Sequence, residues 1–291
     1  MDLRKIIDIE FFIRNERSFC NENFGVINDM VPLLNETKEK NIEIMKNNRN
    51  FNGFVKIDHP VKNAFPKSLN ICFTYHWMNC KSEVMSRYIG KDDNCANIVL
   101  EMNGKIVNLA GRIKSTLAHE LTHAYEDDNR SLSKPGTSLL KTLDDLYTTS
   151  IIIKKNKNEF SHLVDCFADC CYWLNPAERR ANLGRLENEL SEYFVKIYDE
   201  RSAEKYIKQI PLYNELMTIK SEYNEIVGQG NLIMQEIEDK INFDSGTFLT
   251  VKEMNKVIKQ LGNFLDDFEE KLYRNAACIA YEEGTKYMET F

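Results

Sequence analysis

The chain of 291 residues lacks the features that define several large classes of protein. No apolar run reaches the roughly 20 residues that a helix needs to cross a bilayer. The first ten residues include Asp2, Asp8 and Glu10, where a signal peptide would have an uninterrupted apolar stretch. Internal repeats and low-complexity linkers are also missing. These absences predict a soluble, cytoplasmic protein with no membrane attachment.

The chain has fewer basic than acidic residues, and its cysteines do not have the spacing of a disulfide scaffold. The chain has 38 Lys and Arg against 45 Asp and Glu, a net charge of −7. Because non-specific binding to nucleic acid depends on clustered Lys and Arg, a nucleic-acid partner is not expected. Eight cysteines in a chain of this length do not form a small-domain disulfide framework. Cys166, Cys170 and Cys171 are interpreted as reduced thiols buried in a packed helix.

Histidine is scarce, yet two of the five histidines stand four residues apart in one motif. The stretch 117–127 contains His119-Glu120-x-x-His123, and residues four apart in a helix lie on the same face. Both imidazoles can therefore bind one Zn²⁺ from the same side. Glu120 lies about 100° round the helix from His119, within reach of a water on that metal. Composition alone would give this motif about 0.01 times in such a chain, so chance is a poor explanation.

A catalytic zinc site normally has three protein ligands and one open position, so a third ligand is needed. Asp127 follows His119 by two turns, and a continuous helix puts it ~12 Å along the axis, which suits a supporting role. Asn129 stands where a longer histidine motif would have a third histidine. Glu178 is the strong candidate, in the first turn of a helix that Asn175-Pro176 predicts. The acidic alternatives are Glu159, Asp165 and Asp169.

The stretch 117–127, together with Asn175-Pro176-Ala177-Glu178-Arg179-Arg180-Ala181-Asn182, resembles the gluzincin group of zinc metallopeptidases. Its Pro-x-Glu-x-x-Ala helix is similar to that of small bacterial and phage-type metallopeptidases in particular. The resemblance implies that His119, His123 and Glu178 are the Zn²⁺ ligands and that Glu120 is the general base. Asn182 stands where some members have an aspartate that accepts a hydrogen bond from the first histidine, a role an amide can also fill. The resemblance does not extend to residues 201–291.

The resemblance also implies a mechanism. Zinc lowers the pKa of its bound water and polarises the scissile carbonyl, while Glu120 takes the water proton and passes it to the leaving amine. The charge that develops in the transition state needs a further donor. Three candidates for that donor lie near the third-ligand helix: Tyr172, His162 and Arg180. The predicted strand 105–109 is placed to pair with an extended substrate beside the metal helix.

For the fold, we predict an α+β, zincin-like architecture in which a small, mostly antiparallel sheet lies next to the metal-binding helix and a mainly helical second half follows. Strands are predicted near 54–57 and 69–75 from their β-branched and aromatic residues. A hairpin is predicted to join 98–102 to 105–109 through Asn103-Gly104, a dipeptide that type I′ turns prefer.

A catalytic domain is expected over residues 1–200, and a helical C-terminal region over 201–291 is either part of it, a docking module or a lid. Within 1–200 the prediction places an N-terminal helical region at 1–50, the sheet and metal helix at 52–130, and the third-ligand helix at 175–198.

The expected function is zinc-dependent hydrolysis of peptide bonds in a peptide or protein substrate. Two alternatives stay open. A deformylase-like zinc hydrolase would need an upstream cysteine ligand in a Glu-Gly-Cys-Leu setting, which Cys80 and Cys95 lack. A binding or structural protein of phage or mobile-element type could keep the fold and the metal without catalysing a reaction. Metal content and a peptide-cleavage assay separate these readings.

Overall fold

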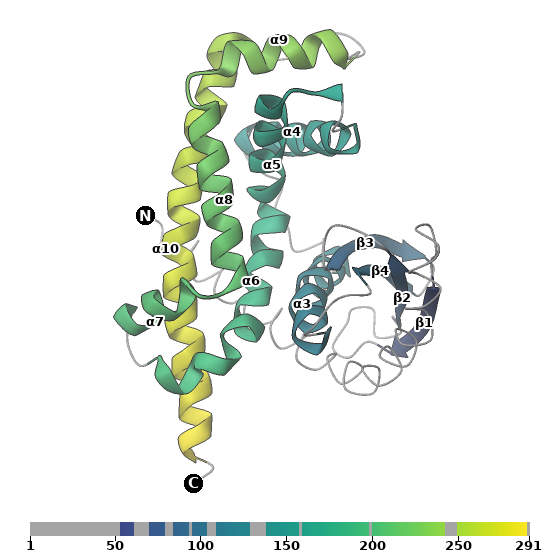
Figure 1. Cartoon of the computed structure of the whole chain (residues 1–291), viewed down its shortest axis with the longest axis vertical. Coiled ribbons are helices and arrows are strands. Elements are labelled where there is room, and N and C mark those ends of the chain that lie inside the picture. The colour runs from purple at the N-terminus through teal and green to yellow at the C-terminus, as the bar shows by residue number, and fades with distance from the viewer. Residues whose placement is uncertain are drawn as a thin grey trace. The chain divides into compact units, whose positions relative to one another are not determined.

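The computed structural model describes residues 53–60, 70–78, 84–92, 95–103, 109–128, 138–156, 159–197, 200–241 and 249–289. Helices account for most of these residues (Figure 1). The elements, in chain order, are β1 (Gly53–Pro60), β2 (Asn70–Met78), β3 (Val84–Asp92), β4 (Cys95–Asn103), α3 (Leu109–Asp128), α4 (Ser138–Lys155), α5 (His162–Trp173), α6 (Pro176–Leu190), η3 (Ser191–Lys196), α7 (Glu200–Ile207), α8 (Pro211–Ile226), α9 (Gly230–Lys240) and α10 (Val251–Glu289). The helical region predicted for 1–50 lies outside the described residues.

Four strands form one sheet with the order β1-β2-β4-β3. The β1–β2 and β3–β4 pairs are antiparallel, whereas the central β2–β4 pair is parallel. A register shift between Tyr88 and Gly90 interrupts the β3–β4 pairing, and Gly90 has φ 107°, a conformation that side chains other than glycine rarely adopt. Because β3 is last in the strand order, it is an edge strand of this sheet. Its register shift is an irregularity typical of edge strands.

The prediction of a zincin-like α+β fold with a mostly antiparallel sheet is wrong. The described residues are predominantly helical, and their sheet is mixed, with a parallel pair between two antiparallel pairs. The first strand of the predicted hairpin, 98–102, belongs to β4. Residues 95–103 pair with β2 and β3, and Leu109, which was expected to end a strand, is the first residue of α3. Residues 104–108 lie outside the described part of the chain.

The helix α3 buries one apolar stripe and packs against β3. Its buried side chains recur at helical spacing and comprise Leu117, Ala118, Leu121 and Ala124. A helix from 109 to 128 agrees with the helical context predicted for the His-Glu-x-x-His motif. The stripe lies beside the two histidines, so α3 can bury one flank while it presents the histidines on another.

The residues group into two compact units by their contacts. The first unit comprises residues 1–133 and 180–191, and the second comprises 134–179 and 192–291. α6 runs without interruption through residues 176–190 and so contributes its first turn to the second unit and the rest to the first. The domain boundary near residue 200 stays a prediction.

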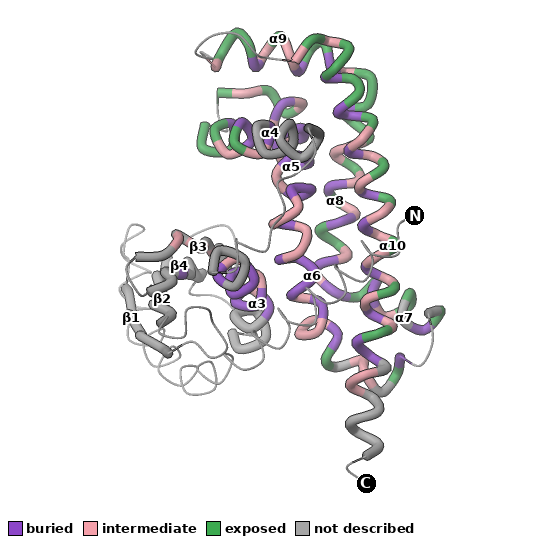
Figure 2. Tube along the Cα trace, turned by 180° about the vertical axis from the view of Figure 1, so that it is seen from behind, coloured by how far each residue is buried: buried purple, intermediate pink, exposed green. Residues whose placement is uncertain are grey.

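The second unit is a set of packed helices. α5 packs against α4 and α8, and α10 packs against α7, α8 and α9. The rings of Trp173 and Phe268 meet edge to face with centroids 4.8 Å apart, which joins α5 to α10. Buried and exposed positions alternate along α8 and α10, as expected of amphipathic helices (Figure 2).

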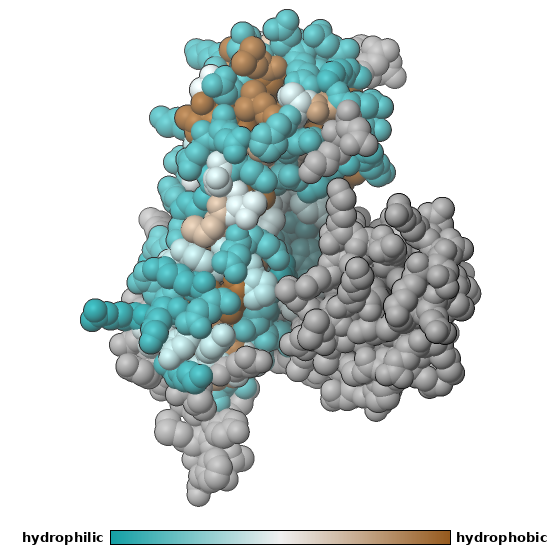
Figure 3. All heavy atoms as spheres, in the orientation of Figure 1, coloured by the Kyte–Doolittle hydropathy of each residue, from teal (hydrophilic) through white to brown (hydrophobic). Residues whose placement is uncertain are grey.

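Three closely spaced thiols lie in the core of the second unit. Cys166, Cys170 and Cys171 are buried and form no disulfide, which confirms the interpretation made from their spacing. On the face shown in Figure 3, most of the described surface of the second unit is hydrophilic, and apolar side chains gather near α9. Among the helices that the structure describes, none combines the length and the apolar character needed to cross a membrane.

Candidate metal centre

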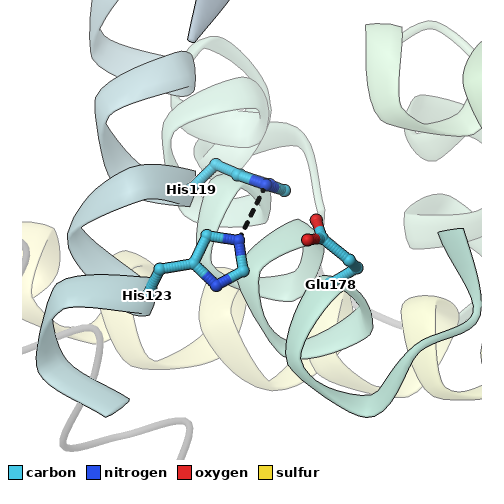
Figure 4. Close-up of side chains that lie close together, drawn as sticks. All are labelled: His119, His123 and Glu178. Carbon is cyan, nitrogen blue, oxygen red and sulfur yellow. Dashed lines mark hydrogen bonds between the residues drawn. The ribbon is translucent and has the colours of Figure 1, made fainter. Parts of the chain in front are cut away.

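Two imidazoles meet on one face of α3. His119 and His123 place their Nε2 atoms 3.2 Å apart, with ring centroids 4.9 Å apart and ring planes at 81° (Figure 4). Two nitrogen ligands bound at about 2.05 Å to a tetrahedral zinc ion would lie about 3.3 Å apart. The observed separation is compatible with two ligands of one tetrahedral metal ion, and also with a hydrogen bond between the two rings.

Glu178 joins the two histidines from the first turn of α6. The helix begins at Pro176, and the Asn175 side chain accepts a hydrogen bond from the backbone N–H of Ala177 at 2.9 Å. Asn175 thus satisfies one of the donors left over at a helix start, and Pro176 supplies the fixed φ of a first helical residue. Glu178 is 3% exposed and points toward the imidazoles (Figure 4). One ligand atom from each of the three residues lies within 4.8 Å of the other two, so the group can hold a metal ion.

Small residues let α6 approach the backbone of α3. A Cβ atom at Gly184 would lie 2.5 Å from Thr122 Oγ1 and 3.5 Å from the carbonyl oxygen of Ala118. Thr122 Oγ1 donates a hydrogen bond of 2.8 Å to that same carbonyl oxygen, so its hydroxyl group is satisfied within α3. Glu178 lies six residues before Gly184 on the same helix, ~9 Å earlier along its axis.

A polar cluster repeats the contact between α3 and α6 further along. Ser115 Oγ donates to Glu189 Oε1 at 2.6 Å, and Arg185 Nε donates to the same oxygen at 3.0 Å. The side chains of Arg185 and Glu189 are largely buried, so this charge-assisted pair is less screened by solvent than a surface pair. Two separate points of contact therefore fix the register of α6 on α3.

Tyr147 on α4 holds the Glu178 carboxylate. Its hydroxyl donates to Glu178 Oε1 at 3.0 Å, and its ring stacks on Tyr172 with centroids 5.5 Å apart. A hydrogen bond of this kind orients a carboxylate ligand. Sequence reasoning missed Tyr147, because it lies 31 residues before Glu178 in no recognisable motif.

Ser86 on β3 holds the candidate base. Glu120 is 3% exposed, and Ser86 Oγ donates to Glu120 Oε1 at 2.5 Å. Burial of a carboxylate is costly unless hydrogen bonds compensate it, so Ser86 both stabilises and orients this group. Sequence reasoning missed Ser86 as well, since β3 itself was not predicted.

The remaining predicted residues have different outcomes. Asn182 is buried one turn after Glu178 on α6. Asp127 belongs to the continuous helix α3, as the supporting-role argument assumed, but its side chain lies outside the described residues. Arg180 is half-buried on α6. Tyr172 stacks on Tyr147 and lies under Lys154, whose Nζ is 4.4 Å from the ring centroid. These four stay predictions as far as their roles are concerned.

His162 does not belong to the group formed by His119, His123 and Glu178. It is the first residue of α5, whereas α6 follows the far end of that helix, ~16 Å along its axis. His162 Nε2 lies instead 3.2 Å from Glu225 Oε2. The acidic alternatives for the third ligand, Glu159, Asp165 and Asp169, are also not part of the group.

No protein-family model, no curated protein and no solved structure matches the chain. Two imidazoles and one carboxylate are the donors that a borderline divalent cation prefers, which fits the geometry of the group.

Proposed function

We propose that the protein is a zinc-dependent peptidase with a gluzincin-type ligand set, in which His119, His123 and Glu178 bind Zn²⁺ and Glu120 acts as general base. The observation that carries this proposal is the convergence of two imidazole nitrogens and one buried carboxylate within 4.8 Å. Two His and one Glu are a ligand set of catalytic zinc sites that keep a fourth position open.

The side chains of the chain supply the proton transfer. When bound, Zn²⁺ makes water more acidic and polarises a carbonyl group. Glu120 accepts the proton of the attacking water and delivers it to the leaving amine, as general base and then general acid. The hydrogen bond from Ser86 holds the Glu120 carboxylate in one orientation, so the proton acceptor is preorganised.

The edge strand β3 supports a peptide as substrate. It is last in the order β1-β2-β4-β3 and is paired with β4 alone among the strands that the structure describes. An extended peptide can add to such an edge through main-chain hydrogen bonds. Because Ser86 of β3 contacts Glu120, a peptide on this edge would run past the general base. β3 thus takes the substrate-binding role that was predicted for 105–109.

Glu120→Gln tests the mechanism, since glutamine keeps the shape but cannot accept the proton. The zinc content, measured by mass spectrometry, is expected to equal that of the wild type, while cleavage of a peptide library falls by about 10²–10⁴-fold. His123→Ala is expected to lose one equivalent of zinc together with activity. Glu238→Gln, an exposed carboxylate on α9, is the matched control and keeps both.

Two results would change the assignment. A Glu120→Gln variant that cleaves peptides like the wild type would refute the general-base role. A wild-type protein that binds zinc through His119 and His123 but cleaves no member of the library would instead be a metal-containing binding protein.

A further inference from the structure

A second group of metal-ligating side chains lies between α5 and α8, within the second unit. His162 and Cys166 are four residues apart on α5 and share one face of that helix. Glu225 reaches them from the last turn of α8. One ligand atom from each of the three lies within 4.8 Å of the other two.

The separations agree with the coordination of one ion. His162 Nε2 lies 3.2 Å from Glu225 Oε2 and 3.7 Å from Cys166 Sγ. With ordinary zinc bond lengths and tetrahedral angles, a nitrogen and an oxygen ligand lie about 3.4 Å apart, and a nitrogen and a sulfur ligand about 3.6 Å apart. Cys166 Sγ also lies 3.8 Å from the other ring nitrogen, His162 Nδ1, so either nitrogen is near the thiol.

The electrostatic surroundings favour a cation at this place. Four carboxylates lie close enough to the Cys166 thiol to act on its charge: Glu222, Glu225, Asp169 and Asp165. The same four carboxylates that disfavour a bare thiolate attract a divalent ion, and such an ion would compensate their charge. Metal binding would then exchange the thiol proton for the ion and release that proton to solvent.

The three ligands are held by packed helices. Ser161 caps α5, and its backbone N–H and Oγ donate to the Glu236 carboxylate of α9 at 2.7 and 2.5 Å. One turn beyond Cys166, the Cys170 thiol donates to the carbonyl of Ile219 on α8. These contacts fix the start of α5 and its packing on α8, so the ligands stand on a defined scaffold.

We propose that His162, Cys166 and Glu225 form a second metal site, which takes Zn²⁺ or another thiolate-binding divalent transition metal and links α5 to α8. The side chains of His162 and Glu225 are 75% and 49% exposed, so an ion can enter from solvent. Cys166, by contrast, is buried and supplies the soft ligand. The proposal is independent of peptidase activity, because His119, His123 and Glu178 include no thiol.

Cobalt titration of the reduced, metal-free full-length protein separates the two sites. A thiolate bound to Co²⁺ gives a near-ultraviolet charge-transfer band that imidazole and carboxylate ligands do not give. The band is expected in the wild type and in His123→Ala, which impairs the first site. Cys166→Ser should abolish it, whereas Cys278→Ser, which changes an exposed thiol on α10, should keep it.

Two further variants guard against a folding artefact at the buried cysteine. His162→Gln and Glu225→Gln change exposed side chains, and each is expected to weaken Co²⁺ binding at this site about tenfold or more while circular dichroism stays unchanged. The proposal is overturned if the wild type shows no charge-transfer band, if Cys166→Ser retains it, or if both exposed-ligand variants bind Co²⁺ as tightly as the wild type.

Discussion

The hydroxyl of Tyr147 donates a hydrogen bond of 3.0 Å to the carboxylate of Glu178, and this contact connects α4 to the first turn of α6. The two residues are 31 positions apart and share no motif, so the sequence does not suggest the contact. Because a carboxylate ligand binds best when its orientation is fixed, we expect Tyr147 to contribute to metal affinity without belonging to the ligand set.

We expect Tyr147→Phe to weaken zinc binding about tenfold, at the lower end of the effect of partners that orient metal ligands. The aromatic ring and its stacking on Tyr172 are retained, so the change reports on the hydroxyl alone. Competition with a chromogenic chelator measures the affinity. Tyr172→Phe, which leaves the Tyr147 hydroxyl in place, is the control and should bind zinc like the wild type. Equal affinity for Tyr147→Phe would show that the hydrogen bond does not orient Glu178.

Ser86→Ala is expected to lower kcat about 10–100-fold without loss of zinc, because it removes the donor that orients the proposed base. The assay is cleavage of a peptide found with the library, with metal content measured on the same sample. Ser191→Ala, at an exposed serine of η3, is a matched control. If Ser86→Ala lost zinc in proportion to activity, the Ser86 hydroxyl would act on the metal ligands and not on Glu120.

Gly184→Ala is expected to destabilise the protein by about 1–3 kcal/mol, because its new methyl group would overlap Thr122 Oγ1. Urea unfolding measures the change. Thr122→Ala removes the obstructing hydroxyl, so the double variant should recover a large part of the loss. A double-mutant cycle with no coupling between the two positions would contradict the close approach of α3 and α6 at this point.

Glu236 should make stability depend on pH in the acidic range. Burial raises its pKa, but hydrogen bonds from Lys240 and from the Ser161 side chain and backbone outweigh that effect and lower the pKa below 4.5. The folded state then binds fewer protons than the unfolded state. The contribution is therefore complete above the ordinary carboxyl range and disappears as pH falls through the lowered pKa.

Glu236→Gln is expected to reduce stability at neutral pH and to lose less stability than the wild type on acidification below about pH 4.5. Urea unfolding at a series of pH values gives the two curves, which should converge at low pH. Glu238→Gln, an exposed neighbour on α9, serves as the comparison. If the free energy of unfolding depended on pH in the same way for the wild type and for Glu236→Gln, the hydrogen bonds to the Glu236 carboxylate would not contribute to stability.

The parts of the site that depend on local signals could be predicted from the sequence. The spacing of His119 and His123 predicted a shared helical face, and Asn175-Pro176 predicted a helix start with Glu178 in its first turn. Each of these signals acts within one or two helical turns. The third-ligand helix was expected to reach residue 198, but α6 ends at Leu190 and a 3₁₀ segment follows.

Contacts between distant segments could not be predicted in the same way. β3 was missed because its sequence, VMSRYIGKD, includes charged residues and a glycine that weaken a strand pattern. Ser86 and Tyr147 could not be identified because they lie 34 and 31 residues away from the carboxylates that they contact, Glu120 and Glu178. Pairing of β2 with β4 likewise depends on residues about 25 positions apart, for which a local dipeptide such as Asn103-Gly104 is no guide.

The 39-residue helix α10, ~58 Å long, has a consequence for the order in which the protein is assembled. It packs against α7, α8 and α9, and it pairs Glu269 with Lys220 and Tyr273 with Tyr213. All of these partners are synthesised before it. A nascent chain that has reached α9 therefore still lacks the helix that packs on α7, α8 and α9, and exposed apolar helix faces are prone to aggregation and are bound by chaperones. The faces of α7, α8 and α9 that α10 covers stay open until α10 itself has been made.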